Sequence, residues 1–78
     1  MMRLTLDSES DAAYVYVTDR AIARTRELDE NRMLDLDGDG EIRGIEFLNV
    51  SQGVELSGLP FQTQLSDLFR GYGIREYA

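Results

Sequence analysis

The sequence of 78 residues carries 15 acidic and 8 basic residues, a formal net charge of -7 at pH 7, and neither cysteine nor histidine. The missing residue types exclude disulfides, thiolate nucleophiles, the usual zinc ligands and the commonest general base at neutral pH. The length predicts one small domain, and the missing residue types lead us to expect neither an enzyme nor a bound cofactor. The negative charge repels nucleic acid and anionic membranes and favours basic protein partners, so we expect no binding to nucleic acid or membrane.

Three strands are predicted in the first part of the chain. Residues 4–6 form a short strand, and the polar cluster at 7–11 turns the chain. Residues 13–17 are apolar on both alternating faces, which is typical of a central strand covered on both sides. Residues 22–28 alternate loosely, with arginines on one face, so we expect them at an edge of the sheet that charge protects.

A calcium-loop template follows these strands. Residues 35–46 read DLDGDGEIRGIE and match D-x-[DN]-x-[DN]-G-x5-E, with Asp35, Asp37, Asp39 and Glu46 as candidate ligands. Such a loop needs a helix before it and another after it, and neither flank carries a helical apolar stripe. Calcium binding is therefore an alternative to a simpler interpretation, a β-hairpin.

The hairpin interpretation uses Gly38-Asp39-Gly40 as a three-residue loop, with Gly40 in the left-handed conformation. The register then expected pairs Asp37 with Glu41, Leu36 with Ile42, Asp35 with Arg43, Leu34 with Gly44, Met33 with Ile45 and Arg32 with Glu46. Two of these pairs join opposite charges and two join apolar side chains. In this register Asp35 and Glu46 face arginines and do not converge on one ion.

The last third of the chain predicts one helix. Helical spacing is shown by Phe61, Leu65, Leu68, Phe69 and Tyr72. Pro60 suits the first turn, so the helix is expected over residues 60–72, packed on one face of the sheet. Residues 51–59, with two glycines among polar residues, are expected to be a connector.

Together the elements predict an α+β fold, a small antiparallel sheet of about four to five hairpin-connected strands with one C-terminal helix on one face. Residues 1–78 are expected to be a single domain with a β-meander over 1–50, a connector over 51–59 and a helix over 60–72. No cationic, apolar leader begins the chain, and no apolar run approaches the roughly 20 residues of a membrane span, so we expect a cytoplasmic protein.

Three pieces of the chain carry a family resemblance: LDSESDAAYVYV, RELDENRMLDLDGDGEIRGIEFLNVS and GLPFQTQLSDLFRGYGIREYA. Together they resemble DUF2283, a family of small prokaryotic proteins of unknown function, most strongly over residues 4–51. The specific parts are the acidic turn ending in Asp11 ahead of Ala12-Ala13-Tyr14-Val15, and Leu34-Asp35-Leu36-Asp37 followed by Gly40 and Gly44-Ile45-Glu46. The family pattern leaves the position of Asp39 free, and it implies an antiparallel sheet with a packed helix but no catalytic or ligand residue.

Some proteins of that family are encoded beside small ribonuclease-like toxin candidates, which implies an antitoxin or partner-binding role. The interpretation that we favour is therefore a non-enzymatic acidic module that docks a basic protein, as an antitoxin-like partner of a basic ribonuclease-type toxin would. A small hydrolase using Asp11 with Asp35 or Glu46 as acid and base is a further alternative. It would need a cleft, which a domain of this size offers only as a dimer.

Tyr14 and Tyr16 are expected to project from the sheet face opposite the helix. Exposure of these aromatic rings to water is unfavourable, so we expect the faces of two copies to pair and form a homodimer. Alternatively, Leu48, Val50 or the tail over 74–77 folds back over the tyrosines within one chain. Ligand stacking on the tyrosines is a weaker interpretation, because aromatic residues on strands usually pack against the sheet.

Overall fold

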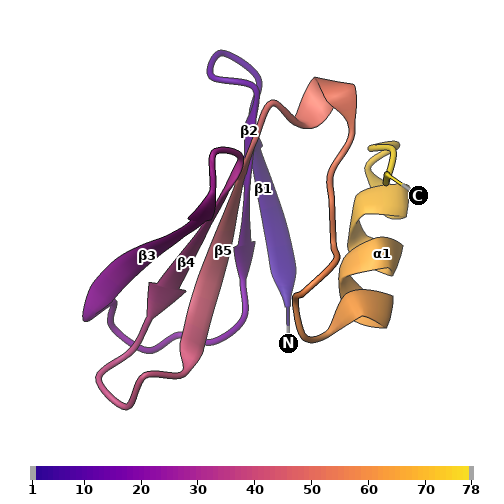
Figure 1. Cartoon of the computed structure of the whole chain (residues 1–78). Helices are drawn as coiled ribbons and strands as arrows, with labels where there is room; N and C mark the ends of the chain where they lie inside the picture. The colour runs from indigo at the N-terminus through magenta and orange to yellow at the C-terminus, as the bar shows by residue number, and fades with distance from the viewer. Residues whose placement is uncertain (1, 78) are drawn as a thin grey trace.

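The computed structural model describes residues 2–77 and contains five strands, a 3-10 helix and one α-helix (Figure 1). They are β1 (Arg3–Asp7), β2 (Ala12–Tyr16), β3 (Arg24–Asp29), β4 (Arg32–Leu36), β5 (Ile42–Leu48), η1 (Val50–Gln52) and α1 (Gln62–Gly71). The five strands form one antiparallel sheet, and α1 lies to one side of it. This arrangement confirms the predicted α+β class.

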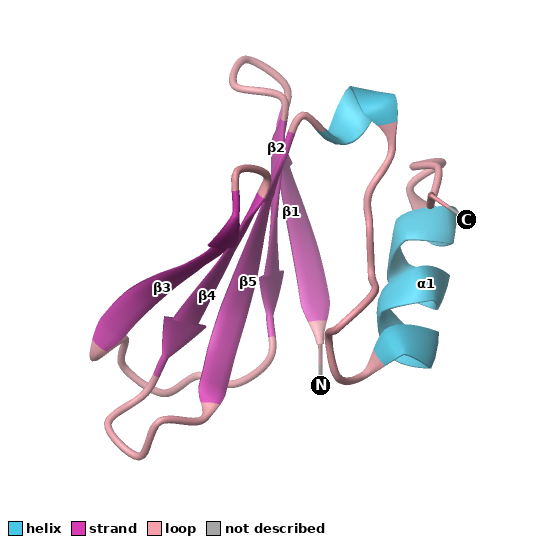
Figure 2. Ribbon diagram, in the orientation of Figure 1, coloured by secondary structure: helices cyan, strands magenta, loops and turns pink. Residues whose placement is uncertain are grey.

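The strands are ordered β1-β2-β5-β4-β3, so the continuous meander expected over residues 1–50 is wrong. After β2 the chain crosses to the far edge of the sheet through residues 17–23, and β3, β4 and β5 then return toward β2 (Figure 2). This order places Val15 of β2 opposite Ile45 of β5, and both side chains are fully buried. As predicted, β3 lies at an edge of the sheet, and its residues are almost entirely exposed.

The core lies between one face of the sheet and α1. Val15, Ile45 and Phe47 are the sheet residues with the least exposure, and Leu65 and Phe69 of α1 are buried against the same cluster. The rings of Phe47 and Phe69 meet edge to face, with centroids 4.9 Å apart. The 3.6-residue period of the helix and the alternation of the strands therefore point their apolar residues at the same layer.

The segment between η1 and α1, residues 53–61, called the inter-helix segment here, belongs to the core and is more than a connector. Val54, Leu56 and Leu59 are all buried there, and in Figure 1 this segment runs between the sheet and α1. The C-terminal tail pairs with it, because the Val54 amide donates to the Arg75 carbonyl at 2.8 Å and the Tyr77 amide donates to the Val54 carbonyl at 2.7 Å. The tail therefore does not cover Tyr14 and Tyr16.

Helix α1 is shorter than the predicted span of 60–72. Phe61 precedes it with φ of 63°, a left-handed conformation that ends the extended chain and starts the helix at Gln62. Within the predicted stripe, Phe61 and Tyr72 remain exposed, and the Tyr72 hydroxyl donates to the Leu4 carbonyl at 3.1 Å. Within residues 2–77, no helix combines the length and apolarity needed to cross a membrane.

The β4–β5 hairpin confirms the predicted loop but not the full register. At its mouth the Asp37 amide donates to the Glu41 carbonyl, and Leu36 lies opposite Ile42. A bulge at Arg43 then shifts the pairing by one residue. The observed pairs are Asp35 with Gly44, Leu34 with Ile45, Met33 with Glu46 and Arg32 with Phe47. The expected pairs Asp35–Arg43 and Arg32–Glu46 are therefore wrong, and the physical reason is that the shift places buried Leu34 opposite buried Ile45.

Gly40→Val tests the turn of this hairpin. Gly40 has φ of 81°, a conformation that a β-branched residue resists, so we expect the free energy of unfolding to fall by about 1 to 2 kcal/mol. Gly38→Ala is the matched control, because a Cβ at Gly38 would meet nothing within 4 Å and should change little. Denaturant unfolding measures both variants, and equal stability would contradict the turn geometry.

Candidate functional site

The sheet face that points away from α1, called the open face here, carries Tyr14, Tyr16, Met33, Asp35 and Glu46. Hydrogen bonds link its side chains across four strands. The Tyr14 hydroxyl of β2 donates to Asp35 of β4 at 2.6 Å, and the Thr25 hydroxyl of β3 donates to the same carboxylate at 2.5 Å. Arg43 of β5 donates to the Tyr14 oxygen at 3.1 Å. The Asp35 carboxylate is thus held by two hydroxyls and not by the arginine expected from the sequence.

Gly44 explains how Tyr14 reaches Asp35 across an intervening strand. β5 lies between β2 and β4, and Gly44 pairs with Tyr16 on one side and with Asp35 on the other. A Cβ built at Gly44 would overlap the hydroxyl and ring carbons of Tyr14. The missing side chain therefore leaves the space in which the Tyr14 ring crosses β5.

Two arginines cover the tyrosine rings of the open face. The Tyr14 and Tyr16 rings lie 4.8 Å apart at 70°, an edge-to-face contact. The Arg3 guanidinium lies 3.7 Å from the Tyr16 ring centroid, and Arg43 lies 5.1 Å from the same centroid. Both arginines are within cation–π range, so they stabilise the rings and shield part of their apolar surface from water.

The same environment fixes the protonation state of Tyr14. Burial, together with the hydrogen bond to Asp35, raises the pKa of Tyr14 to about 12, although Arg43 opposes the rise. The phenol therefore stays protonated at neutral pH and acts as a hydrogen-bond donor. As a general base or a nucleophile, a phenol with this pKa is poorly suited to neutral pH.

A comparison with known protein families identifies the family to which this chain belongs. The family model for DUF2283, described as a protein of unknown function, matches residues 3–51, which is 49 of the 78 residues. The chain belongs to the DUF2283 family. The match spans all five strands and the open face. A search of curated proteins and a search of solved structures each found no match.

The residues that carry the DUF2283 resemblance meet in two places in the structure. Tyr14, Asp35 and Gly44 form the contact across the open face. Asp11, at φ of 55°, accepts hydrogen bonds from the Ser51 amide at 3.0 Å and the Ser51 hydroxyl at 2.7 Å, and so fixes the β1–β2 turn against η1. These contacts give the motif residues a role in holding the sheet together. Sequence reasoning missed the contact of Tyr14 with Asp35, although a glycine inside a predicted strand, here Gly44, can mark a close approach of another group.

The four carboxylates of the calcium template are divided between two places. Asp37 is buried, and it accepts two backbone amides of its own turn while its other oxygen lies 3.2 Å from Arg20. Asp39 pairs with the same arginine at 2.9 Å. Asp35 and Glu46 lie on the open face instead. Over residues 2–77, no three acidic side chains are grouped so that they could hold a metal ion.

Calcium titration therefore has an expected outcome. The pKa of Asp37 lies below its usual range, mainly because its carboxylate accepts a hydrogen bond from the Glu41 amide. Burial opposes this shift, whereas the Asp39 amide and Arg20 add to it. The carboxylate is thus ionised, but the amides of its turn hold one oxygen and Arg20 lies against the other. We expect isothermal titration calorimetry to find no site tighter than about 10 µM, the range of sensor loops. A single tight site would contradict this description of the turn.

The carboxylate pair suggested for a hydrolase is not brought together. Asp11 is held by Ser51 at one end of the sheet, while Asp35 is held by Tyr14 and Thr25. Glu46 lies beside Tyr14 in a hollow of about 130 Å³, which Asp11 and Asp35 do not line. The hollow is smaller than the ~300 Å³ at which ligand pockets begin. The geometry offers no site where two of these carboxylates face one substrate.

The negative charge of the domain is largely unpaired. Within residues 2–77, the ion pairs closer than 4.0 Å use only three of the arginines: Arg20, Arg32 and Arg70. The acidic partners are Asp29, Asp37, Asp39, Glu55 and Asp67. Ten of the 15 acidic residues thus have no arginine within ion-pairing distance. The excess charge is left to water, salt or a partner.

Proposed function

We propose that this DUF2283 chain is a non-enzymatic interaction module that docks a basic protein partner through its acidic surface. The observation that carries the proposal is the set of ten carboxylates without an arginine partner on a domain of charge -7. A surface of one sign steers and orients a partner of the opposite sign. A basic ribonuclease-type toxin is the partner class that we propose, which makes the chain antitoxin-like.

The docking surface that we propose lies at one end of the sheet. The β1–β2 turn and the β3–β4 turn lie at the same end in Figure 1. Together they carry five carboxylates, called the acidic end here: Asp7, Glu9, Asp11, Asp29 and Glu30. Only Asp29 among them pairs with an arginine, Arg32. A basic partner would therefore meet several uncompensated charges in a small area.

Co-purification from the native host tests the proposal. We expect mass spectrometry of the bound material to identify a basic protein, and the complex to be weakened by the double variant Glu9→Lys with Glu30→Lys. The matched control is Asp19→Lys with Glu41→Lys, which changes the net charge equally in the β2–β3 loop and the β4–β5 turn. These two connections lie at the opposite end of the sheet in Figure 1. Recovery of an acidic partner, or a complex that neither double variant weakens, would contradict the proposal.

We also propose that the chain forms a homodimer through the open face. No segment within residues 2–77 covers that face, because the inter-helix segment and α1 pack on the other one. The open face carries Arg3 and Arg43 as well as Asp35 and Glu46, so two copies can present opposite charges to each other around a twofold axis. The half-buried Tyr16 and Met33 supply apolar area.

Sedimentation equilibrium at tens of micromolar tests the dimer. The expected species has twice the 8.9 kDa mass of the chain. Tyr16→Glu should return it to the monomer mass while the circular dichroism of the fold remains unchanged. A wild-type chain at the monomer mass would rule the dimer out, without bearing on the acidic end.

A further inference from the structure

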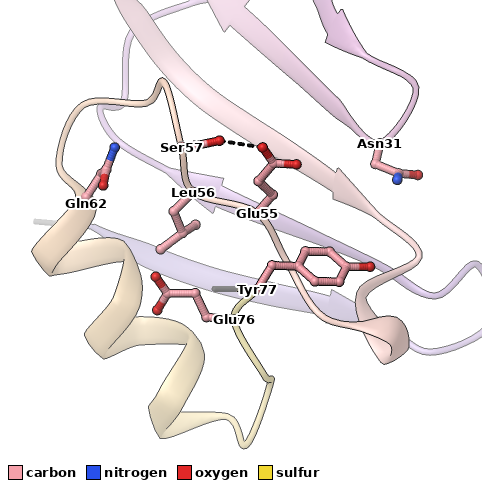
Figure 3. A pocket seen from close by; sticks show the side chains of 7 residues that line it. All are labelled: Asn31, Glu55, Leu56, Ser57, Gln62, Glu76 and Tyr77. Carbon is pink, nitrogen blue, oxygen red and sulfur yellow. Dashed lines mark hydrogen bonds between the residues drawn. The ribbon is translucent and has the colours of Figure 1, made fainter.

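A pocket opens where the inter-helix segment, the C-terminal tail and the β3–β4 turn meet. Its volume is about 650 Å³, within the usual range of ligand pockets. The lining residues are Asn31, Glu55, Leu56, Ser57, Gln62, Glu76 and Tyr77 (Figure 3). All of them except Asn31 follow the end of the family match at residue 51. The pocket is therefore built mainly by the part of the chain that the DUF2283 match does not cover.

The lining combines negative charge, an aromatic ring and neutral polar groups. Glu55 and Glu76 are its charged side chains, and they come from segments separated by 20 residues of chain. In Figure 3 the Tyr77 ring lies beside Glu55 and Asn31, while Glu76 lies nearer to the helix. An aromatic face next to carboxylates is the surrounding that a planar cation prefers, because the ring and the carboxylates both attract it.

Each carboxylate is already oriented by one serine. The Ser57 hydroxyl donates to Glu55, and the Ser66 hydroxyl of α1 donates to Glu76 at 2.8 Å. Among residues 2–77, the second oxygen of each carboxylate accepts no hydrogen bond. The nearest internal cation, Arg32, lies 3.9 Å from Glu55 but directs its hydrogen bonds to Asp29 and to backbone carbonyls. Each glutamate therefore keeps one oxygen for a further donor.

The walls of the pocket are fixed by bonds that do not involve a ligand. Arg32 donates to the carbonyls of Glu55 and Ser57, which holds the inter-helix segment against the sheet. The backbone bonds between Val54 and the tail hold Glu76 and Tyr77 beside that segment. A preformed pocket loses little conformational entropy when it binds.

We infer that this pocket takes the guanidinium group of an arginine side chain on the basic partner. The inference rests on the proposed function, and it names the chemical group that the partner presents. Asn31 belongs to the β3–β4 turn, next to Glu30, so the pocket borders the acidic end and one partner can engage both. A guanidinium can stack on Tyr77 while its forked donors reach the free oxygens of Glu55 and Glu76, which a compact ammonium group does less well.

The test uses the full chain, labelled with ¹⁵N, and titrates it with Nα-acetyl-arginine amide at low salt. The control probe is Nα-acetyl-citrulline amide, which has nearly the same shape and no charge. We expect saturable amide shifts at Asn31, Glu55, Ser57 and Gln62 with the arginine probe, and binding about fivefold weaker or undetectable with citrulline. A third probe, the corresponding lysine amide, should also bind less tightly than the arginine probe.

Variants locate the site. Glu55→Gln with Glu76→Gln should abolish the saturable shifts, and Tyr77→Leu should weaken them, while Asp19→Asn with Glu41→Gln removes two charges elsewhere and should leave them intact. Amide dispersion checks that each variant is folded. The inference is overturned if citrulline or lysine binds as well as arginine, if the shifts spread over all acidic turns as in an unspecific ion atmosphere, or if the pocket variant binds normally.

The two proposals can fail separately. If a basic partner binds the chain but the arginine probe does not, the pocket inference is wrong and the proposed function is unaffected. If the probe binds saturably but the native host supplies no basic partner, the proposed function is wrong and the pocket still binds a guanidinium group.

Discussion

Replacing Gly44 with alanine should lower the free energy of unfolding by about 2 kcal/mol. A Cβ at this position overlaps the hydroxyl and ring of Tyr14, which cannot shift without losing its hydrogen bond to Asp35. Gly44 is buried and lies in the central strand, so the backbone has little freedom to relax. Denaturant unfolding of the variant measures the loss.

A double-mutant cycle with Tyr14→Ala separates the clash from the usual effect of alanine in a strand. Because truncation of the tyrosine removes the atoms that the new Cβ would meet, Gly44→Ala should cost much less in the Tyr14→Ala background. Gly71→Ala is a further control, since a Cβ there meets nothing within 4 Å. Additive effects of the two substitutions would show that Tyr14 does not cross β5 at Gly44.

Arg32→Ala should cost about 3 kcal/mol of stability. Arg32 is only 7% exposed, and its guanidinium donates to the Asp29 carboxylate at 2.8 Å and to the Ser57 carbonyl at 2.6 Å. Its hydrogen bond holds the pKa of Asp29 below its usual range. Removing it takes the donor away from partly buried hydrogen bonds to Asp29, Glu55 and Ser57 and frees the inter-helix segment from the sheet.

Arg26→Ala is the matched control for this substitution. Arg26 is exposed on the edge strand β3, and its loss should change stability by less than about 0.5 kcal/mol. Thermal or denaturant unfolding of the two variants gives the comparison. Equal effects would contradict the role assigned to Arg32.

The local parts of this fold could be predicted from the sequence. Apolar residues on both faces of 13–17 predicted a strand inside the sheet, and β2 does lie between β1 and β5, although only its Val15 face is covered within the described chain. The glycines at 38 and 40 indicated the hairpin loop. The helical stripe around Leu65 and Phe69 indicated the helix and its buried face. In each case a period or a turn residue within a few positions determines the structure.

The rest depends on contacts between distant segments. The bulge at Arg43 places Leu34 opposite Ile45 in the core and Gly44 opposite Asp35, where the glycine leaves room for the Tyr14 ring. Pairing of charges and apolar residues within the hairpin does not predict this shift. Counting opposite charges favoured a register in which Arg32 faces Glu46, whereas the structure buries Arg32 against the segment after η1. That segment was predicted as a connector because its glycines hid the alternation of Val54 and Leu56.

The salt dependence of partner binding tests the central claim most directly. Isothermal titration calorimetry would measure the affinity of the chain for its purified native partner as sodium chloride rises from about 50 mM to about 500 mM, a range over which charge interactions at a surface become screened. Recognition through the unpaired carboxylates predicts that the affinity falls by about tenfold or more. An affinity that does not change with salt would contradict the account.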